Sequence, residues 1–231
     1  MNIKKNKKYL SKILNGEIKI KTSAVEEIYG KSLFPKGNKK LSPKIWSFSY
    51  SSGTSCPSDK LGLCNICTKC YAKKTETIYK NQDCFDKKNK SFFYSTSPKH
   101  VAGYLIQKSI NSKKYPLKVL RLNVAGDFRK ATDLKRFDEI AYYLYEILGV
   151  KTYCYTKRTD LIPELKKLKY IHVNISENQV KGFSSYTAFK TEADRKTALK
   201  DGSINAVCNC GDCYTCKKCI DKNLNIGCLI H

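Results

Sequence analysis

Residues 119–155 read VLRLNVAGDFRKATDLKRFDEIAYYLYEILGVKTYCY, and this stretch predicts a strand, a long helix and a second strand. The short apolar run at 119–124 is typical of a buried strand. The amphipathic helix begins at a cap supplied by Thr132 or Asp133 and ends at Gly149. Residues 150–155 then predict the next strand. A strand–helix–strand order of this kind indicates a parallel sheet with right-handed crossovers.

The same patterns extend to both sides of this unit. Alternating or apolar runs predict further strands at 45–50, 170–175 and 204–207, and helical periodicity predicts helices at 7–15, 98–110, 161–168 and 192–200. We therefore expect an α/β fold, an open or partial parallel barrel of about five to six strands with flanking helices. A complete eight-stranded barrel needs about 250 residues, so this chain is too short for one.

Three regions follow from these patterns. Residues 1–44 form a basic N-terminal segment, residues 45–205 form the α/β core, and residues 206–231 form a Cys-rich metal-binding tail. The core carries a first group of cysteines directly after its first strand.

Ten of the twelve cysteines fall into two groups, which indicates that the thiols share metal ions. The two groups are Cys56, Cys64, Cys67 and Cys70, and then Cys208, Cys210, Cys213, Cys216, Cys219 and Cys228. Steps of three residues are typical of the ferredoxin-type C-x2-C-x2-C run, so we expect one or two iron–sulfur clusters, of the 4Fe-4S type. Zinc is the alternative, although zinc usually takes two separated pairs of ligands.

Disulfides are the third interpretation of these cysteines. The Lys-rich residues 1–15 contain no apolar core of a signal peptide, and we expect a cytoplasmic protein, in which thiols are kept reduced. No stretch reaches the roughly 20 apolar residues that span a bilayer, so no membrane partner is expected.

The formal net charge is +24, with 39 Lys and five Arg among the 44 basic residues. A positive surface attracts polyanions by counterion release, so a nucleic acid or a nucleotide is the expected partner. Part of the lysine excess has another explanation, because Lys, Asn, Ile and Tyr all have AT-rich codons. Protein partners are not indicated by the sequence.

In parallel α/β folds, functional residues gather where the carboxyl ends of the strands meet. The predicted strands bring residues 51–70, 125–129, 156–158 and 176–178 to this edge. Asp127, Lys157 and Glu177 are therefore the candidate catalytic residues. Each has a simpler alternative: Asp127 as the cap of the following turn, Lys157 as a solvated charge and Glu177 as a loop acid.

The order of several motifs resembles the phage gene product 88 family. The matching pieces are TSCP at 54–57 with CYA at 70–72, RLNVAGDF at 121–128, YCYTK at 153–157, CYTCKKC at 213–219, and a final Ile230-His231. This resemblance implies a phage or prophage source, and hence the host cytoplasm.

A second resemblance is to the radical S-adenosylmethionine superfamily, whose members hold a cluster by three cysteines just after the first strand of a partial barrel. Cys64, Cys67 and Cys70 occupy that place, with C-x2-C-x2-C spacing instead of the usual C-x3-C-x2-C. The resemblance implies that Gly126 and Asp127 replace a Gly-Gly-Glu turn that binds S-adenosylmethionine, and that the C-terminal cysteines hold an auxiliary cluster.

Two functional hypotheses follow. The first is a phage-type iron–sulfur enzyme, similar to radical S-adenosylmethionine enzymes, that modifies a nucleotide or a nucleic acid. The alternative is a non-enzymatic nucleic-acid-binding protein whose loops are stapled by zinc or iron–sulfur sites.

Overall fold

The computed structural model describes most of the chain, namely residues 3–31, 33–37, 41–51, 53–65, 70–78, 82–208, 213–220 and 224–229. Its strands are β1 (Ile45–Phe48), β2 (Val119–Leu122), β3 (Lys151–Thr156), β4 (Ile171–Ser176), β5 (Ser184–Phe189), β6 (Ala206–Cys208) and β7 (Asn225–Leu229). The helices are α1 (Ile3–Leu14), α2 (Thr22–Tyr29), α3 (Pro57–Lys60), α4 (Tyr71–Ile78), α5 (Gln82–Ser95), α6 (Pro98–Asn111), α7 (Ala131–Leu148), α8 (Ile162–Leu165), α9 (Glu192–Lys200) and α10 (Cys213–Cys216), with 3-10 turns η2 (Thr159–Leu161) and η3 (Lys218–Ile220).

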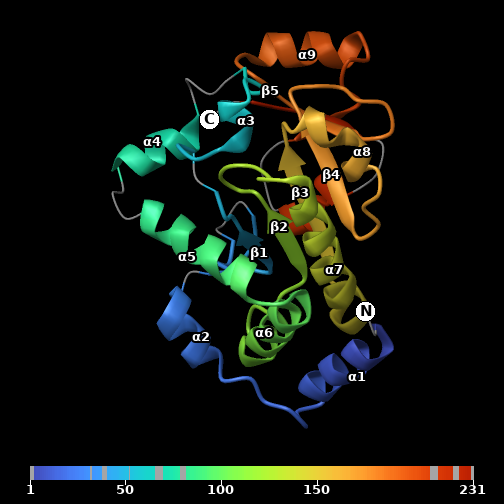
Figure 1. The fold of residues 1–231 in the computed structure, drawn as a ribbon. Helices are drawn as coiled ribbons and strands as arrows, with labels where there is room; N and C mark the ends of the chain where they lie inside the picture. The colour runs from blue at the N-terminus through green and yellow to red at the C-terminus, as the bar shows by residue number, and fades with distance from the viewer. Residues whose placement is uncertain are drawn as a thin grey trace.

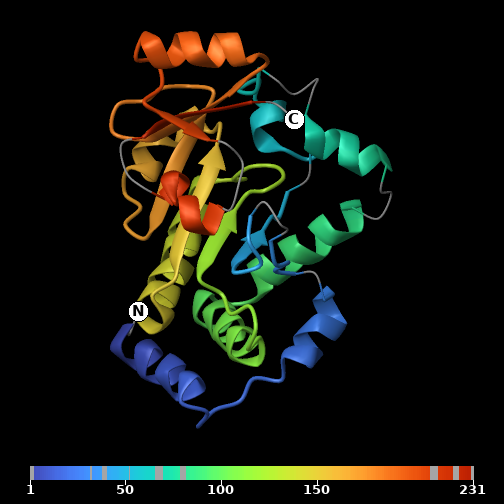
Figure 2. The ribbon, with the colours of Figure 1, turned by 180° about the vertical axis from the view of Figure 1, so that it is seen from behind.

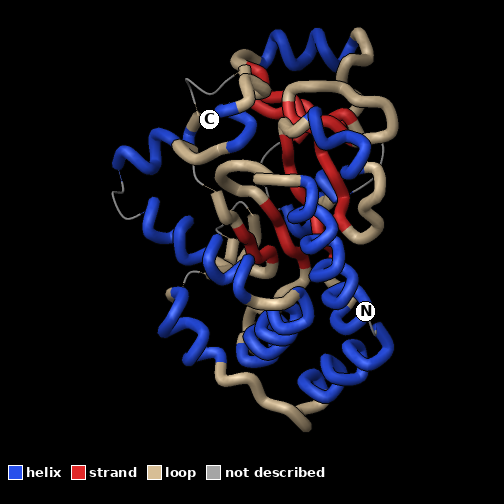
Figure 3. The backbone as a smooth tube through the Cα atoms, viewed as in Figure 1, coloured by secondary structure: helices blue, strands red, loops and turns tan. Residues whose placement is uncertain are grey.

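The seven strands form one parallel sheet in the order β1-β2-β3-β4-β5-β7-β6. The first five strands are neighbours in chain order, and β1 and β6 are the two ends of the order, so the sheet is open. Figure 1 shows the sheet with its helices, and Figure 3 shows the strands at the centre of the molecule with helices outside them. The predicted parallel α/β class is confirmed.

Side chains alternate between two faces of the sheet because successive residues of a strand point in opposite directions. One face, which includes Trp46, Leu120 and Cys154, belongs to the large core together with residues of α1, α6 and α7. The other face includes Ile45, Val119 and Tyr153, and the segment 213–220 packs on it. In Figure 2 this segment lies in front of the sheet, on the side opposite α7.

The number of strands differs from the prediction, because β5 and β7 were not found in the sequence. β5 reads SSYTAF and lacks an apolar run. β7 reads NIGCL and lies inside the segment that the cysteine spacing assigned to metal binding. The tail therefore supplies two strands of the sheet, β6 and β7, in addition to cysteines.

Gly126 joins β2 to the loop that follows it, and its backbone leaves no room for a side chain. Its φ is +68°, a left-handed value that favours glycine. A Cβ added there would collide with the carbonyl oxygen and the hydroxyl of Ser51. The Ser51 hydroxyl also donates to the Asp127 carbonyl at 2.8 Å and accepts from the Asp127 N–H at 2.9 Å. The loops after β1 and β2 are thus in direct backbone contact.

We predict that Gly126→Ala lowers the free energy of unfolding by about 3 kcal/mol or more, since strain and a backbone collision add up. Gly149→Ala is the matched control, because Gly149 has a φ of +65° and open space around its Cα. Its cost is about 1 kcal/mol, from the left-handed conformation alone. Urea unfolding of both variants measures the difference, and equal losses would contradict the role of the Ser51 contact.

Candidate functional site

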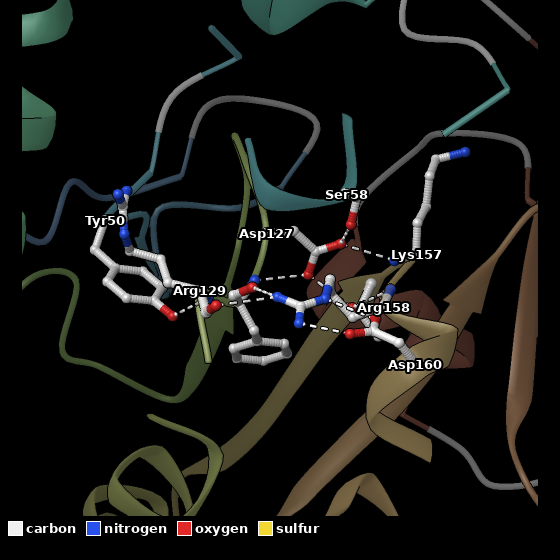
Figure 4. A network of polar contacts seen from close by, with 9 residues as sticks. Tyr50, Ser58, Asp127, Arg129, Lys157, Arg158 and Asp160 are labelled. Carbon is white, nitrogen blue, oxygen red and sulfur yellow. Dashed lines mark hydrogen bonds and ion pairs between the residues drawn. The ribbon is translucent and has the colours of Figure 1, made fainter. Parts of the chain in front are cut away.

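The carboxyl ends of β1, β2 and β3 meet around the buried carboxylate of Asp127 (Figure 4). Its Oδ2 accepts the Ser58 hydroxyl at 2.7 Å and the Lys157 backbone N–H at 2.8 Å. Its Oδ1 accepts the Thr156 hydroxyl at 2.6 Å and the Phe128 N–H at 2.8 Å. One side chain therefore connects the α3 loop, the turn after β2 and the end of β3.

Both oxygens of Asp127 are occupied by donors of the protein itself. Burial raises the pKa of this carboxyl, and the four donors act in the opposite direction because they stabilise the carboxylate. The bond from the Phe128 N–H is the cap of the following turn that the sequence allowed as the simpler alternative. The geometry supports a positioning role for Asp127 and for Gly126, whose space is filled by Ser51.

A second group of contacts fixes the same edge of the sheet. Arg158, which is buried, binds both carboxylate oxygens of Asp160 at 2.7 Å and donates to the carbonyl oxygens of Phe128 and Arg129. The Tyr50 hydroxyl accepts the Arg129 N–H at 2.8 Å. Figure 4 shows this chain of contacts beside Asp127. Arg158 therefore holds the loop after β2 against the end of β3.

The side chain of Lys157 extends away from Asp127 (Figure 4). Its ammonium nitrogen is inaccessible to solvent and has no hydrogen-bond partner among the described residues. Burial lowers the pKa of Lys157, while the negative charges of Glu177 and Asp127, and of Cys70 and Cys56 as thiolates, oppose that shift. The cation of Lys157 thus lies within electrostatic reach of two carboxylates and two cysteine sulfurs.

Cys56 and Cys70 lie within electrostatic range of each other at this edge, although 13 residues separate them in the chain. Burial raises the pKa of the Cys56 thiol, negative charge at Asp127 and at Cys70 adds to the effect, and the N–H groups of Asp59 and Ser58 oppose it. An ion pair of 2.5 Å between Lys73 and Asp59 links α4 to α3. Two of the four predicted ligands of the first group therefore lie close to each other and to the Lys157 cation.

The other two cysteines of the first group differ from this pair. Cys64 is disulfide-bonded in the structure, so it ligates a metal only after reduction. Cys67 lies outside the described residues.

Glu177 follows β4 and adopts a left-handed φ of +64°. Its Oε1 accepts the N–H of Ala188 in β5 at 3.2 Å. Its charge acts on Lys157 and also on Cys228 of β7. Glu177 therefore lies between the two groups of cysteines.

Cysteines of the second group lie on the face of the sheet against which residues 213–220 pack. Cys208 and Cys228 are paired in register on β6 and β7. Burial raises the pKa of Cys219 to about 12, the Tyr155 hydroxyl opposes the shift, and the neighbouring Cys208 and Cys213 add to it.

The remaining members of this group are placed differently. Cys216 is exposed, and Cys210 lies outside the described residues. Within the ranges described, no three His, Cys, Asp or Glu side chains are arranged to hold a metal ion.

Arg121 is a residue of this face that the sequence analysis did not single out. Its guanidinium lies 5.1 Å from the centre of the Tyr155 ring, and its Nε has no hydrogen-bond partner in the described part of the chain. Tyr71, Tyr153 and Cys219 are also within electrostatic range. The signal in the sequence was a lone arginine inside an otherwise apolar strand, VLRL. The half-buried cation of Arg121 is thus within electrostatic range of Tyr71, which follows the first cysteine group, and of Cys219 in the second.

The fold and this edge define a class of protein: an open, all-parallel α/β protein with cysteine-bearing loops at the carboxyl end of its sheet. The family model of Gene product 88 matches residues 24–178, more than half of the chain, so the protein belongs to the Gene product 88 family. The matched range contains Cys56, Asp127, Lys157 and Glu177, and it ends before β5 and the C-terminal cysteines. The family resemblance of the sequence is thereby confirmed.

Neither the search of curated proteins nor the search of solved structures finds a match to this chain. The comparisons thus provide no support for the radical S-adenosylmethionine resemblance.

Among the described helices, none combines the length and apolarity required to cross a membrane.

We predict that Asp127→Asn destabilises the protein by about 3 kcal/mol, because the amide nitrogen of Asn leaves one buried backbone N–H without an acceptor. Asp201→Asn is the control: Asp201 is exposed and accepts the Ser203 N–H at 2.9 Å, a bond that Asn also makes. Its effect stays below about 0.5 kcal/mol. Denaturant unfolding tests both, and an Asp127→Asn protein as stable as the control would refute the positioning role.

Proposed function

We propose that this chain is an iron–sulfur α/β enzyme that works at the carboxyl edge of its sheet, with radical S-adenosylmethionine-type chemistry on a nucleotide or a nucleic acid. The observation that carries the proposal is the convergence of Cys56 and Cys70 with the buried cation of Lys157. Burial raises the pKa of Cys56 and favours its protonated thiol, so metal binding there would displace the proton, because the thiolate is the form that binds metals.

The arrangement of the fold supports this proposal. The first cysteine loop follows β1 directly, and β1 to β5 lie side by side in chain order. In parallel α/β folds, ligands bind outside the carboxyl ends of the strands, where these cysteines lie.

The donor chemistry fits an iron–sulfur cluster. The backbone N–H groups of Ser58 and Asp59 oppose the rise of the Cys56 pKa, and N–H groups near ligand sulfurs tune iron–sulfur clusters. Cys56, Cys70 and either the reduced form of Cys64 or Cys67 would hold the cluster and leave one iron open to S-adenosylmethionine, because a fourth thiolate would saturate the cluster. A cluster bound there supplies the electron for reductive cleavage of a sulfonium, a reaction that belongs to the cofactor.

In this proposal, side chains of the protein itself bind S-adenosylmethionine and orient it. The Lys157 ammonium, which has no hydrogen-bond partner among the described residues, is suited to a carboxylate or a phosphate, and the Glu177 carboxylate to an amino group. An α-amino acid moiety, such as that of S-adenosylmethionine, carries both a carboxylate and an amino group. Asp127 acts through Lys157 and Ser58, because it fixes the backbone of the first and the hydroxyl of the second.

A non-enzymatic nucleic-acid-binding protein with metal-stapled loops is the second candidate. The formal net charge of +24 favours it, since such a charge attracts polyanions without any catalytic site. The cysteine groups would then be saturated structural sites of zinc or iron–sulfur type.

Elemental analysis of anaerobically purified protein tests the metal. We expect iron and inorganic sulfide in near-equal amounts, and less of both in Cys56→Ser and Cys70→Ser. Cys154→Ala is the matched control, since Cys154 is fully buried in the helix-covered core and is no ligand in this proposal. Zinc as the sole metal, or iron unaffected by the Cys56 and Cys70 substitutions, would contradict the proposal.

Cleavage of S-adenosylmethionine separates the two candidates. With a one-electron reductant under anaerobic conditions, we expect cleavage by the unaltered protein and a loss of about 10- to 100-fold in Lys157→Met, which keeps the length of the side chain but removes its charge. Iron content in this variant shows whether the cluster is retained. An iron-loaded protein that cleaves no S-adenosylmethionine favours the stapled binding protein.

A further inference from the structure

Helix α5 presents one face to an open groove of about 570 Å³. The described residues that line it are Lys87, Lys90, Ser91, Tyr94 and Ser95. These positions recur at three- and four-residue intervals, so they share one side of the helix. The described part of the lining combines two ammonium groups, two small hydroxyl groups and one aromatic ring, and none of these residues is acidic.

A third ammonium group reaches the groove from the start of α7. The Lys130 Nζ lies 5.1 Å from the centre of the Tyr94 ring. Tyr94 is 38% exposed as a residue, and its hydroxyl donates to Asp133 at 2.9 Å. The hydrogen bond fixes the ring in place while its accessible part stays open to solvent.

The opposite side of α5 packs against the core of the protein. Asn89, Phe92 and Phe93 are buried, and the Asn89 amide donates to the Ser49 carbonyl at 2.7 Å. Phe93 stacks on Phe137 of α7 with ring centres 4.3 Å apart. The lysines and Tyr94 therefore project from a rigid surface, so little conformational freedom of the backbone is lost on binding.

The groove is connected to the carboxyl edge of the sheet by hydrogen bonds. Tyr94 and Tyr50 both donate to the same oxygen of Asp133, each at 2.9 Å. Tyr50 in turn accepts the N–H of Arg129, two residues from Asp127. A chain bound along α5 would thus lie beside the loop that carries Asp127.

We propose that this groove binds single-stranded nucleic acid, with phosphates at the lysines of α5 and at Lys130 and an unpaired base on the Tyr94 ring. Regularly spaced ammonium groups attract a phosphate backbone by counterion release. An exposed aromatic ring stacks on a base only when that base is unpaired, which favours a single strand over a duplex. None of the described residues that line the groove is a cysteine, and the proposal does not rest on the metal.

The test is fluorescence anisotropy of a labelled oligothymidylate of about 20 nucleotides with the full-length protein, at about 50 to 200 mM salt. We expect binding that weakens with salt. Lys90→Glu lowers the affinity about tenfold and reduces the salt dependence. Lys88→Glu is the matched control, because Lys88 is exposed on the same helix, outside the lining of the groove, and carries the same change of charge.

The control lowers the affinity less than about threefold, as expected for a charge that only contributes to the overall field. Equal losses in the two variants would overturn the assignment of the groove, and so would binding that is insensitive to salt. A duplex of the same length bound as tightly as the single strand would overturn the role of Tyr94. Iron content is measured on the same samples, so a failure of the metal proposal is seen separately.

Discussion

The buried carboxylate of Asp127 is the interaction on which the rest of the site depends. It accepts hydrogen bonds from five groups on three segments of the chain, the longest of them from the Asn123 amide at 3.5 Å, and these segments meet at the same edge of the sheet. A buried charge is tolerated only where donors surround it, so the loops must keep this arrangement for the fold to remain stable. The constraint places Cys56, one residue before α3, and the side chain of Lys157 on the same side of the molecule.

The sequence predicted the class of fold and the edge where its polar residues meet, because both depend on local patterns. Strands β1 to β4 are short apolar or alternating runs, and α7 has a clear apolar stripe that ends at Gly149. The carboxyl ends of parallel strands meet by necessity, which is why Asp127, Lys157 and Glu177 could be grouped without a structure. Their separate roles could not be predicted, because they depend on partners such as Ser58 and Thr156 that are 69 and 29 residues away from Asp127.

The C-terminal segment shows a second reason why sequence patterns did not predict the whole structure. Its cysteine spacing indicated a metal-binding tail, yet β6 and β7 of this segment complete the sheet, and residues 213–220 cover the face that the helices leave open. Asn174 of β4 donates to the carbonyl oxygens of Cys154 and Cys219 and so attaches the segment to the sheet. A cysteine spacing that suggests metal ligands conceals strand propensity, as at Cys208 and Cys228, which lie in β6 and β7.

We propose that cysteine sulfurs at the carboxyl edge of the sheet bind iron in a sulfide-bridged cluster. X-ray absorption at the iron edge, on anaerobically prepared protein, is the decisive measurement. We expect iron surrounded by sulfur, with a second shell of iron that is reduced in amplitude when Cys56 and Cys70 are replaced. Iron coordinated only by oxygen and nitrogen, or a spectrum unchanged by those replacements, would contradict it.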